Sequence, residues 1–378
     1  MVASRVNRFV ITIDARRTQW YPYYGIPRYI RGLFEAVCRL DPPDIEMVAL
    51  LDRAFSTPGW LSALRIRTIT TSWKGSAARQ LAWDMLTLRH LLRSERIDLY
   101  HMPWFERPPP TGILTVVTLH DLHLVWANKK HKTPAERIYS MFARRCLTRA
   151  DGLLFVSQAG RTEAEVLSGG IQQPWRVTPV GWPTLHPEDG AGPQSQPLFR
   201  DEADTSVFRV LVLGGTDWRK NSPRLVRELD LLARDVKNLE VVTTNPGWSE
   251  LLRNRGWHTC LATVNDSDLQ DLMESSTCLV VPSRWEGQGL PVLEAVACRL
   301  PIVCTDLPAV REGGPPGVVY VRESSQIGAY AEAIRLAGDY RLRMSITDAE
   351  RTQYLSAYSW PDTATSTLEV YREVLTRP

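Results

Sequence analysis

Short apolar, β-branched runs alternate with helix-length segments along this chain, and the alternation occurs in two successive series. The first series has strand-like runs at 9–13, 46–51, 113–119 and 152–156 and helix-like segments at 26–40, 79–94 and 134–149. The second has strand-like runs at 207–213, 239–243, 278–281, 302–304 and 317–320 and helix-like segments at 223–234, 266–275, 291–298 and 326–337. This pattern is typical of parallel βαβ units with helices on both faces. It predicts an α/β fold with two Rossmann-like domains.

The two series are separated by a segment of different composition. Residues 186–205 are rich in Pro, Gly, Asp, Glu and Gln without periodicity, which predicts a linker or surface loop. The predicted domains are therefore 1–185 and 206–357, and 378 residues suffice for both. An amphipathic pattern predicts a closing helix within 358–378. Open parallel sheets bind ligands at the C-terminal ends of their strands, so a cleft between the two domains is the expected site.

Charge is distributed unevenly between the two series. Hydrophobic residues at 44% and charged residues at 23% indicate an ordinary globular protein, and a net charge of +3 argues against a nucleic-acid binder. Residues 1–185 hold 25 basic and 15 acidic residues, whereas the rest hold 20 and 27. A basic first half suits an anionic lipid or acceptor, and a plain solvated surface is the alternative.

Cysteine usage and hydropathy predict a cytoplasmic protein. The six cysteines form no C-x-x-C pair, which favours buried thiols in a reducing compartment over zinc or disulfides. The apolar run at 9–13 is too short for a signal peptide, and no run reaches the roughly 18 apolar residues of a membrane span. Peripheral contact with the inner face of a membrane stays open as an alternative, and no oligomeric state is predicted.

The segment VVPSRWEGQGLPVLE at 280–294 carries the most specific chemistry. A strand, a Gly-rich loop and a helix beginning near Pro291 would leave the backbone N–H groups of Gly289 and Leu290 free to bind an anion such as a diphosphate. Glu286 and Glu294 are poor phosphate ligands but good acceptors for sugar and ribose hydroxyls. The alternative interpretation is a capped helix with two surface glutamates.

Arg219 and Lys220 follow the first strand-like run of the second series. Two cations at the mouth of that sheet would neutralise a leaving diphosphate. A solvated helix start is the alternative interpretation.

The spacing of the two glutamates resembles the E-x7-E motif of retaining glycosyltransferases of family 4, which have the GT-B fold. The resemblance extends in order over nearly the whole chain, and it is closest to members that transfer mannose. Further similar segments are YGIPRYI at 24–30, DLYH at 98–101, TLHDL at 118–122, LGGTDWRKNSPRL at 213–225, AVACRLPIVCTD at 295–306 and YSWPDTA at 358–364.

This resemblance implies two Rossmann-like domains that face each other across a cleft, with the C-terminal helix returning to the first domain. On the donor side it implies that Lys220, together with Arg219, holds the diphosphate, that Glu286 holds the sugar hydroxyls and that Glu294 holds the ribose. The remaining implied donor-binding residues are Gly25, Gly215, Gly287, Gln288, Gly289 and Leu290.

The first domain supplies the other candidates. His120 ends a strongly apolar strand, and the resemblance makes it a donor-sugar contact through its side chain or its carbonyl. Asp121 more simply orients the turn, although it is also an acceptor-side candidate. His101 either faces the cleft on the acceptor side or is structural.

An aromatic loop precedes the first helix-like segment. Gly25 opens that helix and lets the backbone approach a phosphate or acceptor closely. Tyr23 and Tyr24 are acceptor-side candidates that would stack on a sugar or lipid, and core packing is the alternative.

The chain departs from the family pattern at four places. Thr216 stands where many members have an arginine, Pro27 replaces a glycine of the first loop, and Gln288 replaces a phenylalanine. Arg299 replaces the glycine that ends the motif helix, which predicts a different local turn because the left-handed conformation disfavours other residues. Neither the change at Gln288 nor that at Arg299 removes a carboxylate or a cation, so an active enzyme is expected.

The expected function is retaining transfer of a hexose from a nucleotide-diphosphate sugar. The favoured donor is GDP-mannose, and the favoured acceptor is a glycan or lipid-linked hydroxyl in surface polysaccharide or lipopolysaccharide synthesis. No metal or other cofactor is expected, because cationic side chains and a helix dipole take the place of Mg²⁺. The alternatives are a UDP- or dTDP-sugar transferase with a small-molecule acceptor, a nucleotide-sugar epimerase, and a sugar-nucleotide or glycan-binding relative without transferase activity.

Overall fold

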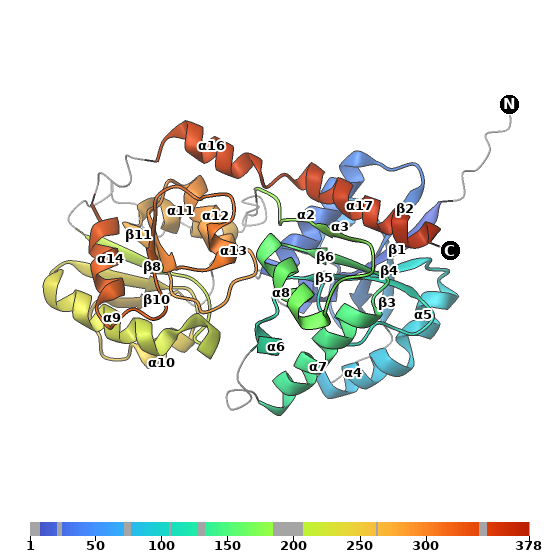
Figure 1. Cartoon of the computed structure of the whole chain (residues 1–378), viewed down its shortest axis with the longest axis horizontal. Coiled ribbons are helices and arrows are strands. Elements are labelled where there is room, and N and C mark those ends of the chain that lie inside the picture. The colour runs from blue at the N-terminus through green and yellow to red at the C-terminus, as the bar shows by residue number, and fades with distance from the viewer. Residues whose placement is uncertain are drawn as a thin grey trace. The chain divides into compact units, whose positions relative to one another are not determined.

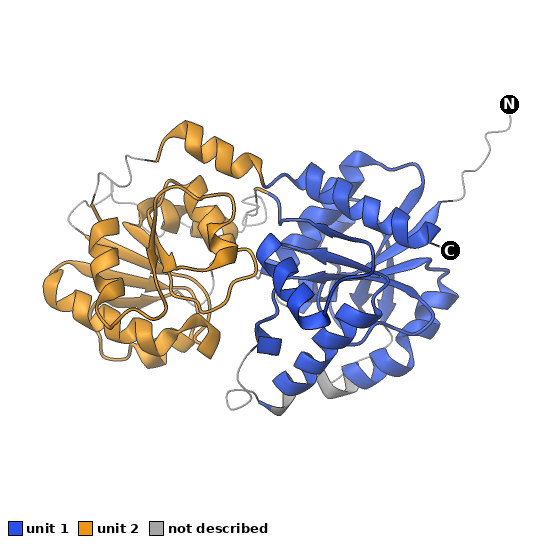
Figure 2. Cartoon of the chain, viewed as in Figure 1, with its two compact units in different colours: residues 1–181, 358–378 blue, residues 182–357 orange. Residues whose placement is uncertain are grey.

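The protein forms two compact units in a computed structural model. Unit 1 comprises residues 1–181 and 358–378, and unit 2 comprises residues 182–357 (Figure 2). The structure describes residues 8–20, 25–71, 77–105, 107–126, 133–183, 207–261, 264–339 and 346–377. The predicted linker at 186–205 lies outside these described residues.

The described residues of unit 1 build a seven-stranded parallel sheet with the order β3-β2-β1-β4-β5-β6-β7. Its strands are β1 (Phe9–Asp14), β2 (Ile45–Asp52), β3 (Arg67–Thr71), β4 (Leu99–Met102), β5 (Leu114–Leu119), β6 (Gly152–Phe155) and β7 (Trp175–Val177). Its helices are α1 (Arg16–Trp20), α2 (Gly25–Leu40), α3 (Gly59–Ala63), α4 (Ala77–Leu86), α5 (Leu88–Ser94), α6 (His123–Trp126), α7 (Pro134–Arg149), α8 (Gln158–Ser168) and α17 (Trp360–Thr376) (Figure 1).

The described residues of unit 2 build a six-stranded parallel sheet with the order β10-β9-β8-β11-β12-β13. Its strands are β8 (Phe208–Val212), β9 (Leu239–Thr243), β10 (His258–Cys260), β11 (Cys278–Val281), β12 (Ile302–Thr305) and β13 (Val318–Val321). Its helices are the 3₁₀ helix η3 (Trp218–Lys220), α9 (Ser222–Asp235), α10 (Gly247–Leu251), α11 (Asp266–Ser275), α12 (Leu290–Ala297), α13 (Pro308–Arg311), α14 (Ala329–Ala337) and α16 (Asp348–Ser356).

Both strand orders reverse direction once, next to the first strand of each unit. This is the doubly wound Rossmann arrangement, in which ligands bind at the C-terminal strand ends beside the reversal. The reversal lies between β1 and β4 in unit 1 and between β8 and β11 in unit 2. The predicted α/β class with two Rossmann-like parts is confirmed.

Most predicted elements are observed, and the differences have simple causes. The predicted helix at 79–94 is two helices, α4 and α5, because the chain breaks at Thr87. The sequence analysis did not predict β3, β7 or β10. β3 has a single apolar residue, Ile69, and β7 and β10 have only three residues each, so none forms an apolar run.

The C-terminal helix α17 packs on unit 1, as predicted. It contacts α2, β5, β6 and β7, and it lies beside α2 in Figure 1. Trp360 at its start approaches Gly32 of α2 so closely that a Cβ there would lie 2.0 Å from the indole Cζ2 atom. Only glycine at position 32 permits this contact, through which the beginning of α17 packs directly against α2.

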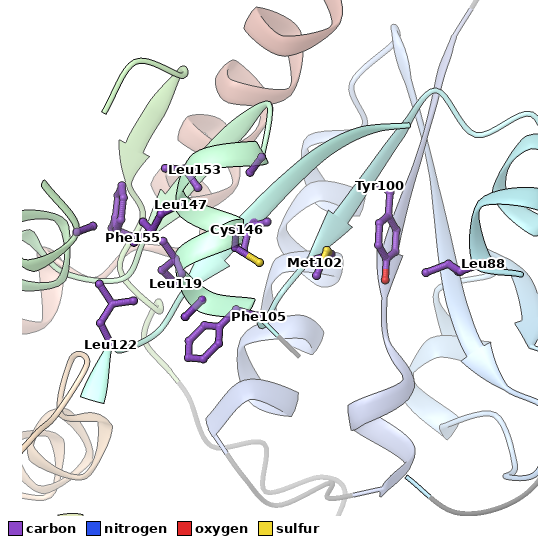
Figure 3. Packing of buried hydrophobic residues seen from close by; sticks show 14 of the residues in the cluster. Leu88, Tyr100, Met102, Phe105, Leu119, Leu122, Cys146, Leu147, Leu153 and Phe155 are labelled. Carbon is purple, nitrogen blue, oxygen red and sulfur yellow. The ribbon is translucent and has the colours of Figure 1, made fainter. Parts of the chain in front are cut away.

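A continuous apolar core fills unit 1 on the other side of the strands. It includes residues from β4, β5, β6 and α7, among them Leu119 and Phe155, together with Phe105 from the segment after β4 (Figure 3). Unit 2 has a separate core around β8, β9, β11 and α14.

Four charged side chains are buried together at the C-terminal end of β1. Arg16 donates to Asp14 at 2.7 Å and to Asp84 at 2.8 Å, and Arg107 bonds both carboxylates. Tyr100 adds a hydrogen bond of 2.8 Å to Asp14. The arginines hold the pKa of Asp14 far below its ordinary value despite its burial, which acts in the opposite direction. Two arginines of the basic half are thus neutralised internally.

The turn after α12 keeps the left-handed conformation that the family's glycine would adopt. Arg299 has φ of +50°, so the predicted change of the local turn is wrong. The backbone N–H of Leu300 donates to the carbonyl of Ala295 at 2.8 Å and closes the helix end. Arg299 also pairs with Asp348 of α16, which compensates part of the conformational cost.

All six cysteines are free thiols. Cys146, Cys278 and Cys304 are buried, and their burial raises the pKa of each thiol to about 12. The other three are only partly buried, so the prediction of buried thiols holds for half of them. Within the described residues, no helix is long and apolar enough to cross a membrane.

Candidate functional site

The loop between β11 and α12 places the predicted anion site at a helix N-terminus. Gly289 is the N-cap residue with φ of +82°, α12 begins at Leu290, and Pro291 occupies its first turn. The first backbone N–H groups of a helix have no partner within the helix, and they carry its partial positive charge. This is the local structure that the motif predicted.

Lys220 and Glu286 form an ion pair within unit 2. Lys220 Nζ lies 2.7 Å from Glu286 Oε1, and both side chains are nearly buried. Burial acts to raise the pKa of Glu286, but the charges of Lys220 and Arg219 outweigh it and hold the pKa below its ordinary value. The predicted phosphate ligand and the predicted sugar ligand are therefore direct neighbours.

The loop after β8 positions Lys220. Gly214 has φ of +92°, and a Cβ there would lie 3.3 Å from Lys220 Cε, so glycine lets the lysine side chain pass over the backbone. Trp248 Nε1 donates to the carbonyl of Gly214 at 3.0 Å. Asp217 caps η3 by accepting from the backbone N–H of Arg219 at 3.0 Å. Gly215, the next predicted residue, lies in the same loop.

Asn221 is a residue of this loop to which the sequence analysis gave no role. It is buried and left-handed, with φ of +54°, and it joins η3 to α9. Asparagine tolerates this conformation better than most residues. Its position directly after Arg219 and Lys220 in the R-K-N segment is the sequence feature that could have indicated its structural role.

The two loops that carry the ion pair are also joined by other contacts. The backbone N–H of Arg284 donates to the carbonyl of Arg219 at 2.8 Å. The rings of Trp218 and Trp285 meet edge to face with their centroids 5.6 Å apart. These contacts fix the distance between the cations of η3 and the carboxylate of Glu286.

The remaining predicted donor residues lie on the loop and helix that Glu286 begins. Glu294 is 1% exposed inside α12, and Gln288 is also buried. Gly287 lies between Glu286 and Gln288 in the loop. Because both glutamates are enclosed, the interpretation as two surface glutamates does not describe this helix.

One Asp-x-Asp triplet, a pattern often found at metal sites, occurs at Asp266-Ser267-Asp268. It forms the first turn of α11, where Asn265 accepts from the backbone N–H of Asp268 at 2.8 Å. Carboxylates are favourable at a helix N-terminus without a metal. Among the described residues, no three His, Cys, Asp or Glu side chains gather as a metal site would require.

His120 lies directly after β5 in unit 1. Its ring meets the ring of Tyr29 edge to face at 5.0 Å and lies 6.2 Å from that of Trp104. Burial lowers the pKa of His120 to about 4, although Asp121 and a hydrogen bond to the carbonyl of Pro103 act in the opposite direction. The imidazole is therefore neutral at pH 7. Its buried Nε2 atom has no partner among the described residues.

His101 is enclosed in the sheet on β4. Its Nδ1 lies 2.6 Å from Tyr371 Oη and its Nε2 lies 2.7 Å from Thr118 Oγ1. Burial, with a smaller contribution from His120, lowers the pKa of His101 to about 3. Both ring nitrogens are used inside the protein, which supports the structural alternative over contact with an acceptor.

Of the other predicted residues of unit 1, the structure describes Asp121, which follows β5, and Gly25, which begins α2. Asp121 accepts from the backbone N–H of His123 at 3.3 Å and contacts its Nδ1, which fits the predicted role in the turn. Gly25 is the first residue of α2. Tyr23 and Tyr24 lie outside the described residues.

Comparisons with known proteins agree with this architecture. Two family models match: "Glycosyl transferases group 1" over residues 207–337 and "Glycosyl transferase 4-like domain" over residues 25–181. An O-antigen chain mannosyltransferase B from Escherichia coli is 24% identical over 74% of this chain and 76% of its own length.

Solved structures show the same fold. Sucrose-phosphate synthase from Thermosynechococcus elongatus superposes with a TM-score of 0.70 at 15% identity, over 98% of this chain and 100% of that one. WaaG, a glycosyltransferase involved in lipopolysaccharide biosynthesis, superposes with a TM-score of 0.67 at 17% identity, also over 98% and 100%.

The two doubly wound units and the similar solved structures show the GT-B fold, and the two family models identify the class of protein as a glycosyltransferase. The chain belongs to family 4 of the glycosyltransferases.

Proposed function

We propose that this glycosyltransferase moves a hexose, with retention of configuration, from a nucleotide-diphosphate sugar to a hydroxyl of a glycan or lipid-linked acceptor. The observation that carries the proposal is the Lys220–Glu286 ion pair of 2.7 Å. A ligand that joins a diphosphate to a sugar presents both an anion for Lys220 and hydroxyl donors for Glu286. A plain phosphate or a neutral glycan would meet only one of the two groups.

In the proposed transfer step, negative charge develops on the leaving diphosphate. The bond between the anomeric carbon and the diphosphate oxygen breaks, and the acceptor oxygen bonds to the same face of that carbon. The acceptor proton passes to an oxygen of the leaving diphosphate. Lys220, Arg219 and the N-terminus of α12 stabilise the negative charge that develops there.

The carboxylates hold the donor in place. Diphosphate binding draws Lys220 from Glu286, and the freed carboxylate accepts hydroxyl hydrogens of the sugar. Glu294 accepts from the ribose, and backbone groups of Gly289 and Leu290 bind the phosphates. Neutral His120 accepts a sugar hydroxyl through Nε2, which is consistent with its low pKa and its hydrogen bond to the Pro103 carbonyl.

We favour GDP-mannose as the donor and synthesis of surface polysaccharide or lipopolysaccharide as the setting. The support is the similarity to the Escherichia coli O-antigen mannosyltransferase over three quarters of the chain. The basic first half suits an anionic acceptor or peripheral contact with an anionic membrane surface. No metal or other cofactor is included, since cations and the helix dipole supply the positive charge.

The test is a binding screen followed by a transfer assay. GDP, UDP, dTDP and ADP and their sugar conjugates are titrated into the protein and the melting temperature is followed. A ligand at 100 times its Kd stabilises the folded state by about 2.7 kcal/mol. The matching sugar is then offered with candidate acceptors, and the anomeric configuration of the product is read by NMR.

Each result has a defined meaning. A selective response to GDP and GDP-mannose with an α-linked mannoside as product supports the proposal in full. A selective response to UDP or dTDP would overturn the proposed donor and leave the proposed type of reaction unchanged. Binding without transfer to any acceptor supports the alternative of a binding protein without transferase activity, and an inverted product overturns retention.

A further inference from the structure

A chain of four hydrogen-bonded side chains lies buried beneath His120 in unit 1. Tyr371 Oη is 2.6 Å from His101 Nδ1, His101 Nε2 is 2.7 Å from Thr118 Oγ1, and Thr118 Oγ1 is 3.0 Å from Tyr29 Oη. All four side chains are fully buried. We call this set the tyrosine-histidine relay.

The relay joins four elements that are distant in the sequence. Thr118 is on β5 and His101 is on the neighbouring strand β4, whereas Tyr29 comes from α2 and Tyr371 from α17. Tyr371 and His101 are 270 positions apart. The C-terminal helix therefore reaches the middle of the unit 1 sheet through a polar contact as well as through apolar packing.

The end of the relay lies against His120. The ring of Tyr29 meets that of His120 edge to face at 5.0 Å, with an interplanar angle of 84°. Thr118 comes two residues before His120, at the end of β5. The ring of Tyr29 also lies 6.5 Å from that of Trp360, the first residue of α17. The helix thus reaches Tyr29 directly through Trp360 and indirectly through Tyr371 and His101.

The protonation state of His101 makes both of its hydrogen-bond partners necessary. Its pKa of about 3, lowered by burial, keeps the ring neutral, so one nitrogen donates and the other accepts. Tyr371 and Thr118 occupy the two nitrogens. Removing either hydroxyl leaves a buried ring nitrogen without a partner, which disfavours the observed arrangement.

We propose that Tyr29 is a positioning residue for His120 and that Tyr371, acting through His101 and Thr118, holds Tyr29 in place. The C-terminal helix would then set the orientation of the imidazole that meets the donor sugar. The catalytic part of this inference rests on the proposed function of His120.

The first test is independent of activity. The ring signals of His120 are followed by NMR in protein labelled at histidine, and they are assigned by their loss in His120→Gln. Tyr29→Phe and Tyr371→Phe are expected to shift these signals. Tyr330→Phe is the matched control, because it removes a similar buried contact of 2.6 Å to Thr305 in unit 2. Unchanged His120 signals in Tyr371→Phe would overturn the proposal.

The second test is a double-mutant cycle on transfer. Tyr371→Phe is expected to lower kcat about tenfold, which corresponds to about 1.4 kcal/mol, and to leave the Kd of the free nucleotide unchanged. In a His120→Ala background the same substitution is expected to change kcat less than twofold. An equal loss in both backgrounds would show a general structural role instead.

Two substitutions of Thr118 distinguish a variant that keeps the hydroxyl from one that removes it. Thr118→Ser retains the hydroxyl and is expected to keep wild-type kcat and His120 signals, whereas Thr118→Val removes it and is expected to behave like Tyr371→Phe. Equal behaviour of the two variants would contradict the relay. If the wild type transfers no sugar, the proposed function fails, and the NMR comparison still decides the positioning.

Discussion

Lys220 and Glu286 are ion-paired to each other at 2.7 Å, although they belong to loops 66 residues apart. The lysine follows β8 and the glutamate follows β11, two adjacent strands of the sheet. The two opposite charges neutralise each other, and the charges of Lys220 and Arg219 hold the pKa of the nearly buried Glu286 below its ordinary value. In the proposed reaction, a bound diphosphate sugar replaces this internal bond with one bond to each group.

Glu286→Gln is therefore expected to separate nucleotide binding from sugar binding. The neutral amide releases Lys220, so free nucleoside diphosphate binds at least as tightly as in the wild type. The extra affinity of the sugar conjugate is lost, and transfer falls about 100-fold or more, the range for removal of a key charged contact. Calorimetric titration and initial rates measure the two effects.

The control for this variant is Glu250→Gln on the exposed surface of α10. It is expected to leave both affinities and the rate unchanged. Weaker binding of the free nucleotide in Glu286→Gln would contradict the release of Lys220.

The lowered pKa of Glu286 also affects the stability of the folded protein. The contribution of this carboxylate to stability is present above the unfolded-state pKa and is lost only as pH falls through the lower folded-state pKa.

Asp84→Asn is expected to destabilise unit 1 strongly. The substitution leaves Arg16 and Arg107 buried with one carboxylate instead of two, and breaking a buried ion pair costs about 3–5 kcal/mol. Denaturation in urea measures the loss. Asp44→Asn breaks a partly exposed pair with Arg372 and is expected to cost at most about 1 kcal/mol. Similar losses in the two variants would contradict the role of burial.

Arg299 permits a test of backbone strain. Its φ of +50° is disfavoured for residues with a Cβ by about 1–2 kcal/mol. Arg299→Gly is expected to be more stable than Arg299→Ala by about that amount, since both lose the contact with Asp348 and only glycine relieves the strain. Thermal unfolding of the pair gives the comparison. Equal stabilities would show that the turn is not left-handed.

Glu163 on α8 gives unit 1 a stability that depends on pH near neutrality. Burial, together with the charge of Asp121, raises its pKa to about 7, and His123 acts in the opposite direction. The folded state therefore binds the proton more tightly than the unfolded state. The contribution of Glu163 to stability decreases as pH rises from about 4.5 to about 7.

Glu163→Gln is expected to remove this decrease. The difference in unfolding free energy between the wild type and the variant is measured at pH 5 and at pH 8, and it should favour the variant more at pH 8. Glu165→Gln on the same helix, which removes a carboxylate paired with Arg161, is the control for the loss of a glutamate from α8. A difference that is independent of pH would contradict the raised pKa.

The sequence predicted the parts of the site that one local segment carries. A strand, a glycine turn and a proline-initiated helix are specified within 280–294, so the place of Glu286 and of the α12 N-terminus followed from that segment alone. The place of Lys220 after β8 followed in the same way. Their ion pair could not be predicted from local patterns, because it depends on the strand order that puts β8 next to β11.

The contacts around His120 could not be predicted from local sequence patterns, for a similar reason. Tyr29 and Tyr371 occur in amphipathic helices, where a tyrosine at an inward position looks like any other core residue. Only the packing of α17 on α2 and the sheet brings Tyr371 to His101. The buried charges were likewise hidden, because Asp14 and Arg16 meet Asp84 of α4 and Arg107, which follows β4, only in the folded unit.

The inclusion of α17 in unit 1 has a consequence for the synthesis of this protein on the ribosome. Unit 1 is interrupted by the whole of unit 2 in the order of translation. Until α17 emerges, His101 lacks the hydroxyl of Tyr371, and the face that receives Trp360 and Val374 is open to solvent. Domains that are complete in sequence can fold as they leave the ribosome. Here the first unit to be made is the last to be finished, so an incomplete chain carries an exposed apolar surface that chaperones and proteases can recognise.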